Sequence, residues 1–520
     1  MKTLYKKEDF FVKNSKWLLR IALLLLVCTM FLGAVACQKT PTDDPETTPE
    51  TDPVTPDTDS GETDPTDTEP TDTEPADTEP TEGENLPELN MGGKEYTVLL
   101  RAGDEYLNDI GIMKVYESSS SIDRAVYTRN SAVMERYGMI FNFKTVQEGD
   151  FSSTVIAGRV KPDQYGMLVG SGRQVFGGIL SGYYADWNDL KYVDLTQPYW
   201  AQSAVDQWST PAGKVFAMNG DLSYMSVGNS TAMFFNKNII EEVGVTSPYQ
   251  LVYDDAWTVE AFIQMATDCD SNLDGDGSGA ITTDTFGYAT QGWRGPIYAT
   301  FCGGVGALEK KNDGTYKIGI SKESVADVIQ DYIDMLVTTD VAHYGELGAI
   351  RTAFQAGNVV FTDDNVKCAV NFSGTALDFG ILPWPKSGAR VDYVSLVGSG
   401  TNTFAVYGNM STEAMEETSA ILEAMACYGK RDVLDYYYGT VLSYQATKDE
   451  DSLAMLEIIH DALFYDFAHY ACFGNIGDVV KLVVEDPGTY GGNIYTGIAH
   501  LEEKTMAELE LWYLLDLEEE

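Results

Sequence analysis

Polar and aromatic side chains follow several of the strands and turns that this sequence predicts. Arginine donates hydrogen bonds, carboxylates accept them, and an aromatic ring offers a flat apolar face. Together such groups suit the non-covalent binding of a hydroxylated solute. The candidate ligand-binding residues are Arg101, Glu105, Ser171, Arg173, Asp221, Tyr224, Trp293, Asp364 and Trp384.

Trp293 is the strongest single candidate. It lies in Gln291-Gly-Trp-Arg-Gly-Pro, where flanking glycines leave the aromatic side chain free to be presented and Arg294 can act beside it. Each candidate also has a structural alternative. An Arg or Asp in a loop is often only solvated, and Trp384, between two prolines, suits a packed turn equally well.

Catalytic motifs are missing from the sequence. It contains no HExxH, no GxSxG and no glycine-rich phosphate loop followed by Lys. A glycoside hydrolase needs only two carboxylates across a cleft, and 80 acidic residues leave such a pair open. We therefore predict a protein that is not an enzyme, with a hydrolase as the rival class.

One acidic turn resembles a calcium-binding loop. Asp270, Asn272 and Asp274, with Gly275, match the first half of an EF-hand loop, and Asp276 adds a further carboxylate. The twelfth position is Ile281 where a Glu belongs. A structural Ca²⁺ and a metal-free Asx-rich turn both remain open, and no other cofactor is expected.

The N-terminus has the order of a secretory signal. A basic segment precedes the apolar run Ile21–Val35, which is short for a membrane-spanning helix of ~20 residues. Ala36 before Cys37 resembles the cleavage site of bacterial lipoproteins, which implies a signal peptide over 1–36 and lipidation of Cys37. The alternative is an ordinary signal peptide with an incidental cysteine.

The next segment, 37–90, is rich in Pro, Thr, Asp and Glu, and it repeats Thr-Asp-Thr-Glu-Pro. Such a composition buries too little apolar surface to offset the chain entropy, so we predict a disordered tether. The net charge of −46 repels nucleic acid. It also disfavours strongly anionic ligands unless the cleft is locally basic.

Five cysteines follow the tether, widely spaced and odd in number, so a complete disulfide framework is impossible. We expect buried thiols with one bridge at most. The four histidines show no zinc-binding spacing.

The folded part alternates predicted strands and helices. Strands are expected at 95–100, 140–143, 165–169, 231–236, 359–362 and 379–382, with helices starting at Ser121, after Thr258 and after Ser411. This order indicates an α/β fold with largely parallel sheets, in which ligands lie at the carboxyl ends of strands. A length of ~430 residues is too large for one core, so two or three lobes are expected.

Several blocks resemble extracellular solute-binding proteins of the sugar-importer type. Their order and spacing cover most of 94–475, whereas the C-terminus from about Thr489 is less similar. The blocks are Trp187–Trp200, Gly213–Asp221, Phe234–Gly244 with Trp257-Thr, Asp274-Gly-Asp-Gly with Phe286-Gly-Tyr, and Gly380–Lys386.

The resemblance implies a two-lobed, periplasmic-binding-protein-like (type II) fold similar to the maltose-binding group, with a hinge and an inter-lobe cleft. The expected lobes are 91–228 with 358–410, and 229–357 with 411–520. Hinge closure over a sugar or oligosaccharide would follow.

By the same resemblance, the chain would be a monomer held on the extracellular face of the cell membrane by its lipid anchor. Its partners would be the membrane subunits of an ABC importer. The alternatives are a lipid-anchored glycoside hydrolase and a sensor or adhesion protein without transport.

Overall fold

The computed structural model describes residues 86–111, 121–271, 281–388, 391–446 and 449–517. By its contacts the chain divides into two units, 1–83 and 84–520, and all described residues belong to the second. Leu86 is buried and its carbonyl accepts a hydrogen bond from Arg136, so the predicted tether boundary at residue 90 lies too late. None of the described helices combines the length and hydropathy that a membrane span needs.

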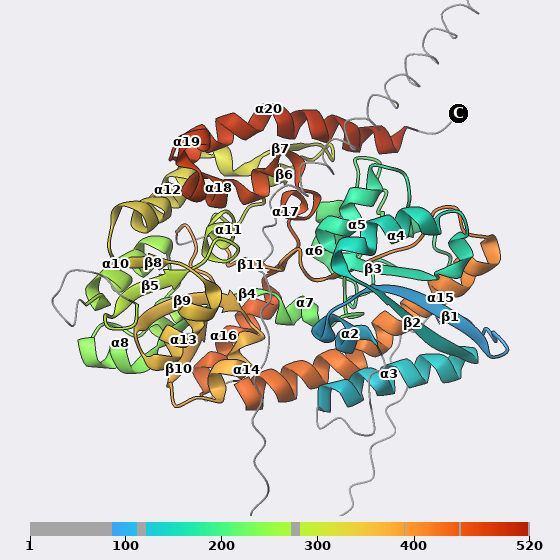
Figure 1. The fold of residues 1–520 in the computed structure, drawn as a ribbon, viewed down its shortest axis with the longest axis horizontal. Coiled ribbons are helices and arrows are strands. Elements are labelled where there is room, and N and C mark those ends of the chain that lie inside the picture. Colours follow the sequence, from blue (N-terminus) through green and yellow to red (C-terminus); the bar gives the residue numbers. More distant parts are fainter. Residues whose placement is uncertain (1–85, 112–120, 272–280, 389–390, 447–448, 518–520) are drawn as a thin grey trace, which may run out of the picture. The chain divides into compact units, whose positions relative to one another are not determined.

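The first lobe is built on a four-stranded sheet of order β12-β3-β1-β2, of which Figure 1 labels β1, β2 and β3. Its strands are β1 (Lys94–Arg101), β2 (Met139–Val146), β3 (Met167–Ser171) and β12 (Asn402–Ala405). β1 pairs in parallel with β2 and β3, and β12 is antiparallel to β3. β3 is buried along its whole length, as expected of an inner strand covered on both faces.

Helices cover this first sheet. They include α3 (Ser121–Tyr137), α4 (Phe151–Gly158), α5 (Gly172–Ile179) and α15 (Thr412–Tyr428). α15 begins after Ser411, which was predicted to start this helix, and the Ser411 hydroxyl caps it by accepting a hydrogen bond from the Ala414 amide. α15 lies on the first lobe, where Thr418 accepts a hydrogen bond from Tyr96 and donates one to the Gly166 carbonyl.

The second lobe contains a five-stranded sheet of order β10-β4-β9-β5-β8. Its strands are β4 (Thr231–Asn236), β5 (Phe286–Thr290), β8 (Ala342–Tyr344), β9 (Val359–Asn365) and β10 (Phe379–Leu382). β5 is parallel to β8 and β9, but β4 is antiparallel to β9 and β10. The sheet is therefore mixed rather than largely parallel as predicted.

The main helices of the second lobe are α8 (Lys237–Val243), α10 (Val259–Cys269), α12 (Glu323–Thr338), α13 (Leu347–Ala356), α14 (Cys368–Ser373) and α16 (Glu450–Asp461). Thr258 caps α10 as predicted, since its hydroxyl accepts a hydrogen bond from the Ala261 amide at 3.3 Å.

The predicted division of the chain between the lobes is wrong in two places. The segment 358–410 was expected in the first lobe, but β9 and β10 pair with β4 and β5 in the second sheet. The segment 411–520 was expected in the second lobe, but α15 packs on the first. The apolar pattern predicts a strand or a helix, but it does not specify which sheet the element joins.

The chain crosses between the lobes near Asn229, again near Gly398, and a third time through two π-helical segments, Gly429–Leu434 and Tyr437–Ala446. The first two crossings lie side by side, because Ser230 pairs with Val397. The turn after β9 joins them: the Lys367 amide donates a hydrogen bond to the Gly228 carbonyl at 2.9 Å.

The C-terminal region contacts both lobes. It comprises β13 (Leu463–Phe464), α17 (Phe467–Ala471), α18 (Val479–Glu485) and α20 (Ile494–Tyr513), and β13 pairs with β11 (Ser395–Leu396). On the first-lobe side, Phe176 and Trp208 pack their rings against Tyr470 at 5.9 and 4.8 Å between centroids. On the other side, α18 packs against α11 (Gly295–Ala299) and α12 of the second lobe.

Candidate ligand-binding cavity

One cavity of about 190 Å³ is lined by residues at or after the carboxyl ends of strands from both sheets. β1 and β3 of the first lobe end near it, and so do β5 and β9 of the second. Turns after strands, the first two crossings and the C-terminal region all contribute side chains. The lining residues are Glu105, Tyr106, Asn229, Trp293, Arg294, Ile297, Tyr298, Asn365, Lys367, Gly398, Gly400 and His469.

Larger hollows of about 460, 530 and 660 Å³ exist elsewhere on the described residues. The first lies within the second lobe, beside α8, and the second within the first lobe, beside α4. The third lies between the segment 206–213, which contains the end of α6 (Gln202–Trp208), and the segment 304–314. None of them combines strand ends from both main sheets, so the smaller cavity is the better candidate site.

Trp293 lies in the turn between β5 and α11, and its side chain is 50% exposed. The other six tryptophans of the described residues are at most 3% exposed, so Trp293 is the one available for contact with a solute. Its amide donates a hydrogen bond to the side-chain oxygen of Gln291 at 2.5 Å. Two cations lie over its ring, with Arg173 at 5.3 Å and the Lys481 nitrogen at 4.4 Å from the centroid.

The glycines that flank Trp293 and Arg294 have a different role from the predicted one. A Cβ at Gly292 would lie 2.1 Å from Glu485, and a Cβ at Gly295 would lie 2.1 Å from the Tyr288 hydroxyl. Neither glycine has a positive φ. Gly295 is therefore required where the turn packs closely on Tyr288 and Tyr332, whereas at Gly292 the flexible Glu485 side chain could move aside.

Arg294 lies against a buried carboxylate on β9. Its Nε donates to Asp364 at 3.1 Å, and Arg351 from α13 donates to the other carboxylate oxygen at 2.6 Å. Burial alone would raise the pKa of Asp364, but the two guanidinium groups outweigh burial and hold it below its usual range. Asp364 thus orients Arg294 and is itself only 1% exposed.

The neighbouring carboxyl, Asp363, lies on the opposite face of β9 and accepts a hydrogen bond from Tyr288 at 2.5 Å. Burial raises the pKa of Asp363 to about 7, although hydrogen bonds from Tyr288 and Thr290 oppose the shift.

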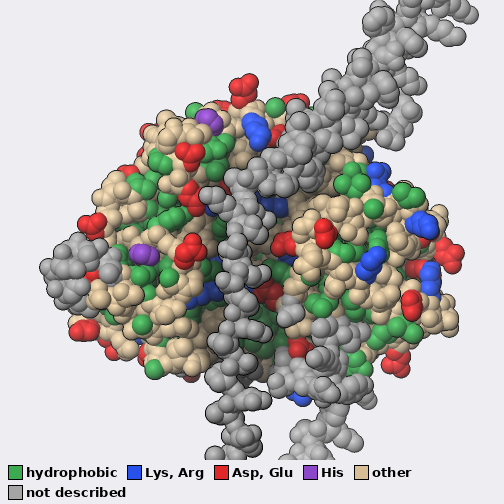
Figure 2. Space-filling view, in the orientation of Figure 1, with side chains coloured by type: hydrophobic (Ala, Val, Ile, Leu, Met, Phe, Trp, Pro, Cys, Tyr) green, Lys and Arg blue, Asp and Glu red, His purple; other side chains and the backbone are tan. Residues whose placement is uncertain are grey.

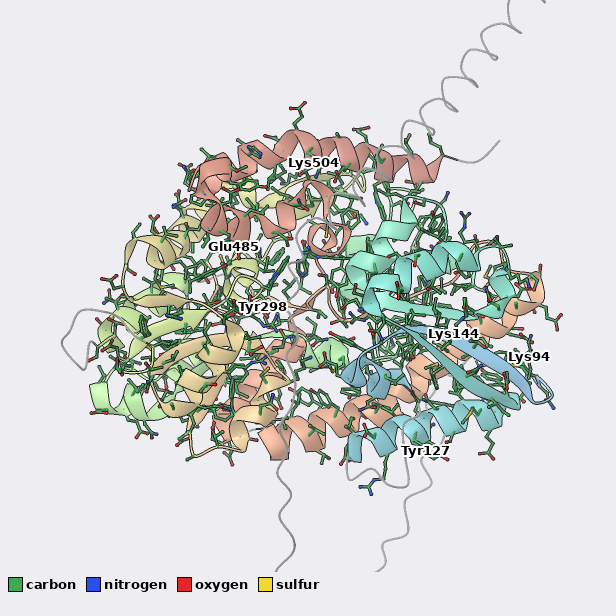
Figure 3. All side chains as sticks on the ribbon, viewed as in Figure 1. Lys94, Tyr127, Lys144, Tyr298, Glu485 and Lys504 are labelled. Atoms are coloured by element: carbon green, nitrogen blue, oxygen red, sulfur yellow. The ribbon has the colours of Figure 1, made fainter. Side chains whose placement is uncertain are left out.

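Amide side chains link the crossings beneath the cavity. The Tyr298 hydroxyl donates to Asn365 at 2.8 Å, Asn365 donates to Asn229 at 3.4 Å, and Asn229 donates to Thr401 at 3.1 Å. Figure 3 labels Tyr298 toward the middle of the view, where the two lobes meet. This chain of hydrogen bonds ties α11 of the second lobe to both adjacent crossings.

The first lobe contributes Glu105 and Tyr106, which begin α2 (Asp104–Ile110). Glu105 accepts a hydrogen bond from Lys367 at 2.5 Å, in an ion pair that joins the first lobe to the turn after β9. Burial would raise the pKa of Glu105, but Lys367 outweighs burial and lowers it. Arg101 is buried, with its guanidinium 3.5 Å from the Tyr106 ring centroid, so it supports the lining without reaching the cavity.

His469 of α17 forms a cluster with Arg173 and Asp478. Its Nε2 accepts a hydrogen bond from the Ser399 amide at 3.2 Å, which leaves the proton on Nδ1, 3.5 Å from Asp478. Arg173 donates to both oxygens of Asp478 at 2.7 and 2.9 Å. Burial lowers the pKa of His469, which favours the neutral ring. The cluster fixes α5 of the first lobe to the C-terminal region.

The remaining predicted residues do not line the cavity. Ser171 caps α5 in a reciprocal pair with Gln174. Asp221 lies near Lys430 of the third crossing, and burial raises its pKa to about 8. Tyr224 packs on Tyr437 at 4.8 Å, and Trp384 is buried against Tyr298 at 5.6 Å. Trp384 is thus a core residue, the structural alternative named above.

Of the four predicted calcium ligands, only Asp270 lies among the described residues. Asp270 accepts a hydrogen bond from the Gly287 amide at 3.1 Å, and burial raises its pKa. Asn272, Asp274 and Asp276 lie outside the described residues, as does Cys37. Within the described ranges, no cluster of three or more metal-ligating side chains is found. The five described cysteines are all free thiols.

Sequence reasoning missed Tyr106, Tyr298, Lys367 and His469. Tyr106 directly follows the predicted Glu105 and was within reach of the same strand-end argument. Tyr298 lies five residues beyond the predicted Trp293. Lys367 and His469 come from the turn after β9 and from the C-terminal region. No local pattern marks these two positions.

No protein-family model and no curated protein matches the sequence. Solved structures match the fold at low identity. The cyclic alpha-maltosyl-1,6-maltose binding protein of Arthrobacter globiformis matches with a TM-score of 0.55 and 16% identity, over 81% of this chain and all of the other. The maltose/maltodextrin-binding domain MalE of Bdellovibrio bacteriovorus, bound to maltotriose, gives 0.50 and 12%, over 80% and 100%.

The ABC substrate-binding protein Lmo0181 of Listeria monocytogenes, in complex with cycloalternan, matches with a TM-score of 0.50 and 10% identity, over 80% of this chain and 99% of the other. This chain has the two-lobed fold of the maltose-binding-like solute-binding proteins. The predicted fold class is confirmed. In this two-lobed fold, the cavity at the strand ends is the one that both lobes and the crossings enclose.

Proposed function

We propose that the chain is the substrate-binding protein of an ABC importer and that it captures a small sugar in the cavity between its lobes. The observation that carries the proposal is the position of Trp293. It is the one half-exposed tryptophan of the described residues, and it lies where the strand ends of both lobes meet. The indole supplies an apolar surface for a sugar ring, and the charged side chains around it bind hydroxyl groups.

The size of the cavity favours a small ligand. Sites for drug-sized molecules typically measure ~300–1,000 Å³, whereas this cavity measures about 190 Å³. A single sugar unit suits that volume better than a long oligosaccharide. Rotation of the lobes about the crossings would enlarge it and admit the ligand.

Two contacts would change with that rotation. Glu105 of the first lobe pairs with Lys367, and Arg173 of the first lobe lies over Trp293 of the second. Separation of the lobes would break both contacts. A ligand that binds Glu105 and Trp293 at once stabilises the closed form, which the importer would recognise.

The anchor belongs to the same proposal. Cys37, lipidated after removal of 1–36, would hold the protein on the extracellular face of the cell membrane, and the acidic tether would let the folded part reach the importer subunits. Two acyl chains suffice for stable attachment. A Cys37→Ala variant should appear in the culture medium, and its retention in the membrane fraction would contradict the lipid anchor.

The main alternative is a glycoside hydrolase, which requires two carboxylates on either side of the scissile bond. Glu105 is the one carboxylate among the residues that line the cavity. This lining favours binding over hydrolysis.

The test is a thermal-shift screen of the mature chain against neutral and acidic monosaccharides, disaccharides and longer oligosaccharides. A sugar that binds only the native state raises the melting temperature. At a concentration one hundred times its Kd, it adds about 2.7 kcal/mol to the free energy of unfolding. Chromatography of the same mixtures detects cleavage. A shift with intact sugar supports the proposal, and release of a smaller sugar supports the hydrolase.

A further inference from the structure

The cavity has a charge balance opposite to that of the whole chain. The chain carries 80 acidic and 34 basic residues. On the face shown in Figure 2, acidic side chains are dispersed over the surface. The cavity lining instead contains two full cations, Arg294 and Lys367, against one carboxylate, Glu105. The net negative charge of the chain disfavours an anionic ligand unless the cleft is locally basic. The lining of this cavity meets that condition.

The ion pairs around the cavity leave positive charge in excess. Lys367 and Glu105 neutralise each other. Asp364 is shared by two guanidinium groups, with Arg351 at 2.6 Å and Arg294 at 3.1 Å. One carboxylate cannot neutralise two cations. The adjacent carboxyl, Asp363, faces Tyr288 on the other side of β9, and neither guanidinium forms an ion pair with it among the described residues.

Arg294 is the member of that group that lines the cavity, and it retains free donors. A guanidinium has five N–H groups. Nε is bound to Asp364, and one Nη1 hydrogen is directed to the Trp293 carbonyl at 3.3 Å. Among the described residues, Nη2 has no hydrogen-bond partner. The Nη1–Nη2 edge is therefore available for bidentate binding of a carboxylate or phosphate.

Two further cations lie at Trp293. Arg173 and Lys481 lie within 5.3 and 4.4 Å of its ring centroid. Each has its own carboxylate, Asp478 and Glu485. They do not add net charge, but they place further hydrogen-bond donors beside the indole.

We propose that the ligand of this cavity is a small hydroxylated molecule with one anionic group, a carboxylate or a phosphate, which Arg294 binds through its free edge with Lys367 beside it. The inference rests on the proposed function and narrows its substrate class. A single negative charge on the ligand would offset the single excess positive charge of the lining.

Matched acid and neutral pairs test the inference on the unmodified mature chain. Calorimetry would compare D-glucuronate with D-glucose, D-galacturonate with D-galactose, and glycerol 3-phosphate with glycerol. At least one acid should bind tenfold or more tightly than its neutral partner, and its affinity should fall with added salt. The uronates and the phosphate ester distinguish the two sources of negative charge.

Variants assign the effect to one residue. Arg294→Gln should lose the preference for the acid by at least tenfold. Arg294→Lys keeps the positive charge but loses the paired N–H donors of the guanidinium group. This variant should retain part of the preference for the acid. Arg124→Gln removes an exposed cation from α3 and should leave the preference unchanged. Thermal unfolding without ligand verifies that each variant is folded. If Arg294→Gln does not fold, the comparison of acid and neutral ligands on the unmodified chain still tests the inference.

Three results would overturn the inference. If a neutral sugar binds as tightly as its acid, the ligand class is wrong while the proposed function stands. The same holds if Arg294→Gln leaves the preference for the acid unchanged. If no sugar of either kind binds, both the inference and the proposed function fail.

Discussion

The turns that follow the strands of the two lobes serve different purposes. In the first lobe, Arg101 lies on the Tyr106 ring, Ser171 caps α5, and Arg173 is bound to Asp478. In the second lobe, the turn after β5 brings Trp293 and Arg294 to the cavity itself. Residues at the strand ends therefore mainly stabilise the fold in the first lobe, whereas in the second lobe they line the cavity.

This difference assigns recognition mainly to the second lobe. The first lobe adds Glu105 and Tyr106, and the rest of its strand-end chemistry fixes the crossings and the C-terminal region in place. Substitutions in the second-lobe turn should therefore weaken binding, and substitutions at the first-lobe strand ends should mainly reduce stability.

The largest effect is expected for Asp364→Asn. The change leaves Arg294 and Arg351 without their buried counter-charge, and breaking a buried pair costs about 3–5 kcal/mol of unfolding free energy. Urea denaturation measures it. Asp189→Asn, at an exposed position, is the control and should change stability by less than about 0.5 kcal/mol. A loss below about 1 kcal/mol for Asp364→Asn would show that the two guanidinium groups do not depend on this carboxylate.

Trp293→Ala comes next and should separate binding from stability. Because the side chain is half exposed, the melting temperature should hardly change. Affinity should fall at least tenfold, equivalent to about 1.4 kcal/mol.

The first-lobe counterpart is Glu105→Gln, which keeps the shape of the side chain and should weaken binding by less than tenfold. Calorimetry with one ligand compares the two variants. A larger loss for Glu105→Gln than for Trp293→Ala would reverse the assignment of recognition to the second lobe.

Asp363→Asn tests how two adjacent carboxyls on β9 differ, since the pKa of Asp363 is raised and that of Asp364 is lowered. The folded-state pKa of Asp363 is raised from 3.8 to about 7, so the native protein holds this proton more tightly than the unfolded chain. Its contribution to stability is present below pH 4 and is lost as the pH rises through 7.

Between pH 5 and 8, the unfolding free energy of the variant should therefore fall less steeply with pH than that of the wild type. The two slopes should differ by up to about 1.4 kcal/mol per pH unit. Denaturation at several pH values measures the slope, with exposed Asp268→Asn as the control. An unchanged slope would mean that Asp363 is ionised in the native protein at pH 5.

Ser171→Ala should have the smallest effect. It removes the N-cap of α5 in the first lobe and should cost about 1 kcal/mol of stability with no change in ligand affinity. Denaturation and calorimetry of the same sample measure both quantities. A clear loss of affinity without a loss of stability would place Ser171 in the binding site after all.

The sequence specified the elements well where local chemistry decides them. Thr231–Asn236 is an apolar run that forms β4 with the predicted bounds, and Ser411 and Thr258 cap the predicted helices. It failed at the division between lobes, because the pairing of β9 with β4 and β5 depends on contacts between segments far apart in the chain.

The candidate site, like the fold, was predictable only where local sequence patterns decide the position of a residue. Glu105 follows a predicted strand and Trp293 lies in a predicted turn, and both line the cavity. Asp364 also follows that argument, but its two arginine partners bury it behind the lining, which no sequence pattern indicates. Lys367 and His469 reach the cavity only through the crossings and the C-terminal region.

Collisional quenching of tryptophan fluorescence by acrylamide tests the central claim most directly. Trp293 is the accessible indole of the described residues, so acrylamide should quench mainly its emission. The tightest-binding sugar, added at saturation as verified by calorimetry, should reduce that quenching, and Trp293→Phe should abolish the difference. Unchanged quenching at full saturation would mean that the solute binds elsewhere and would contradict the assigned cavity.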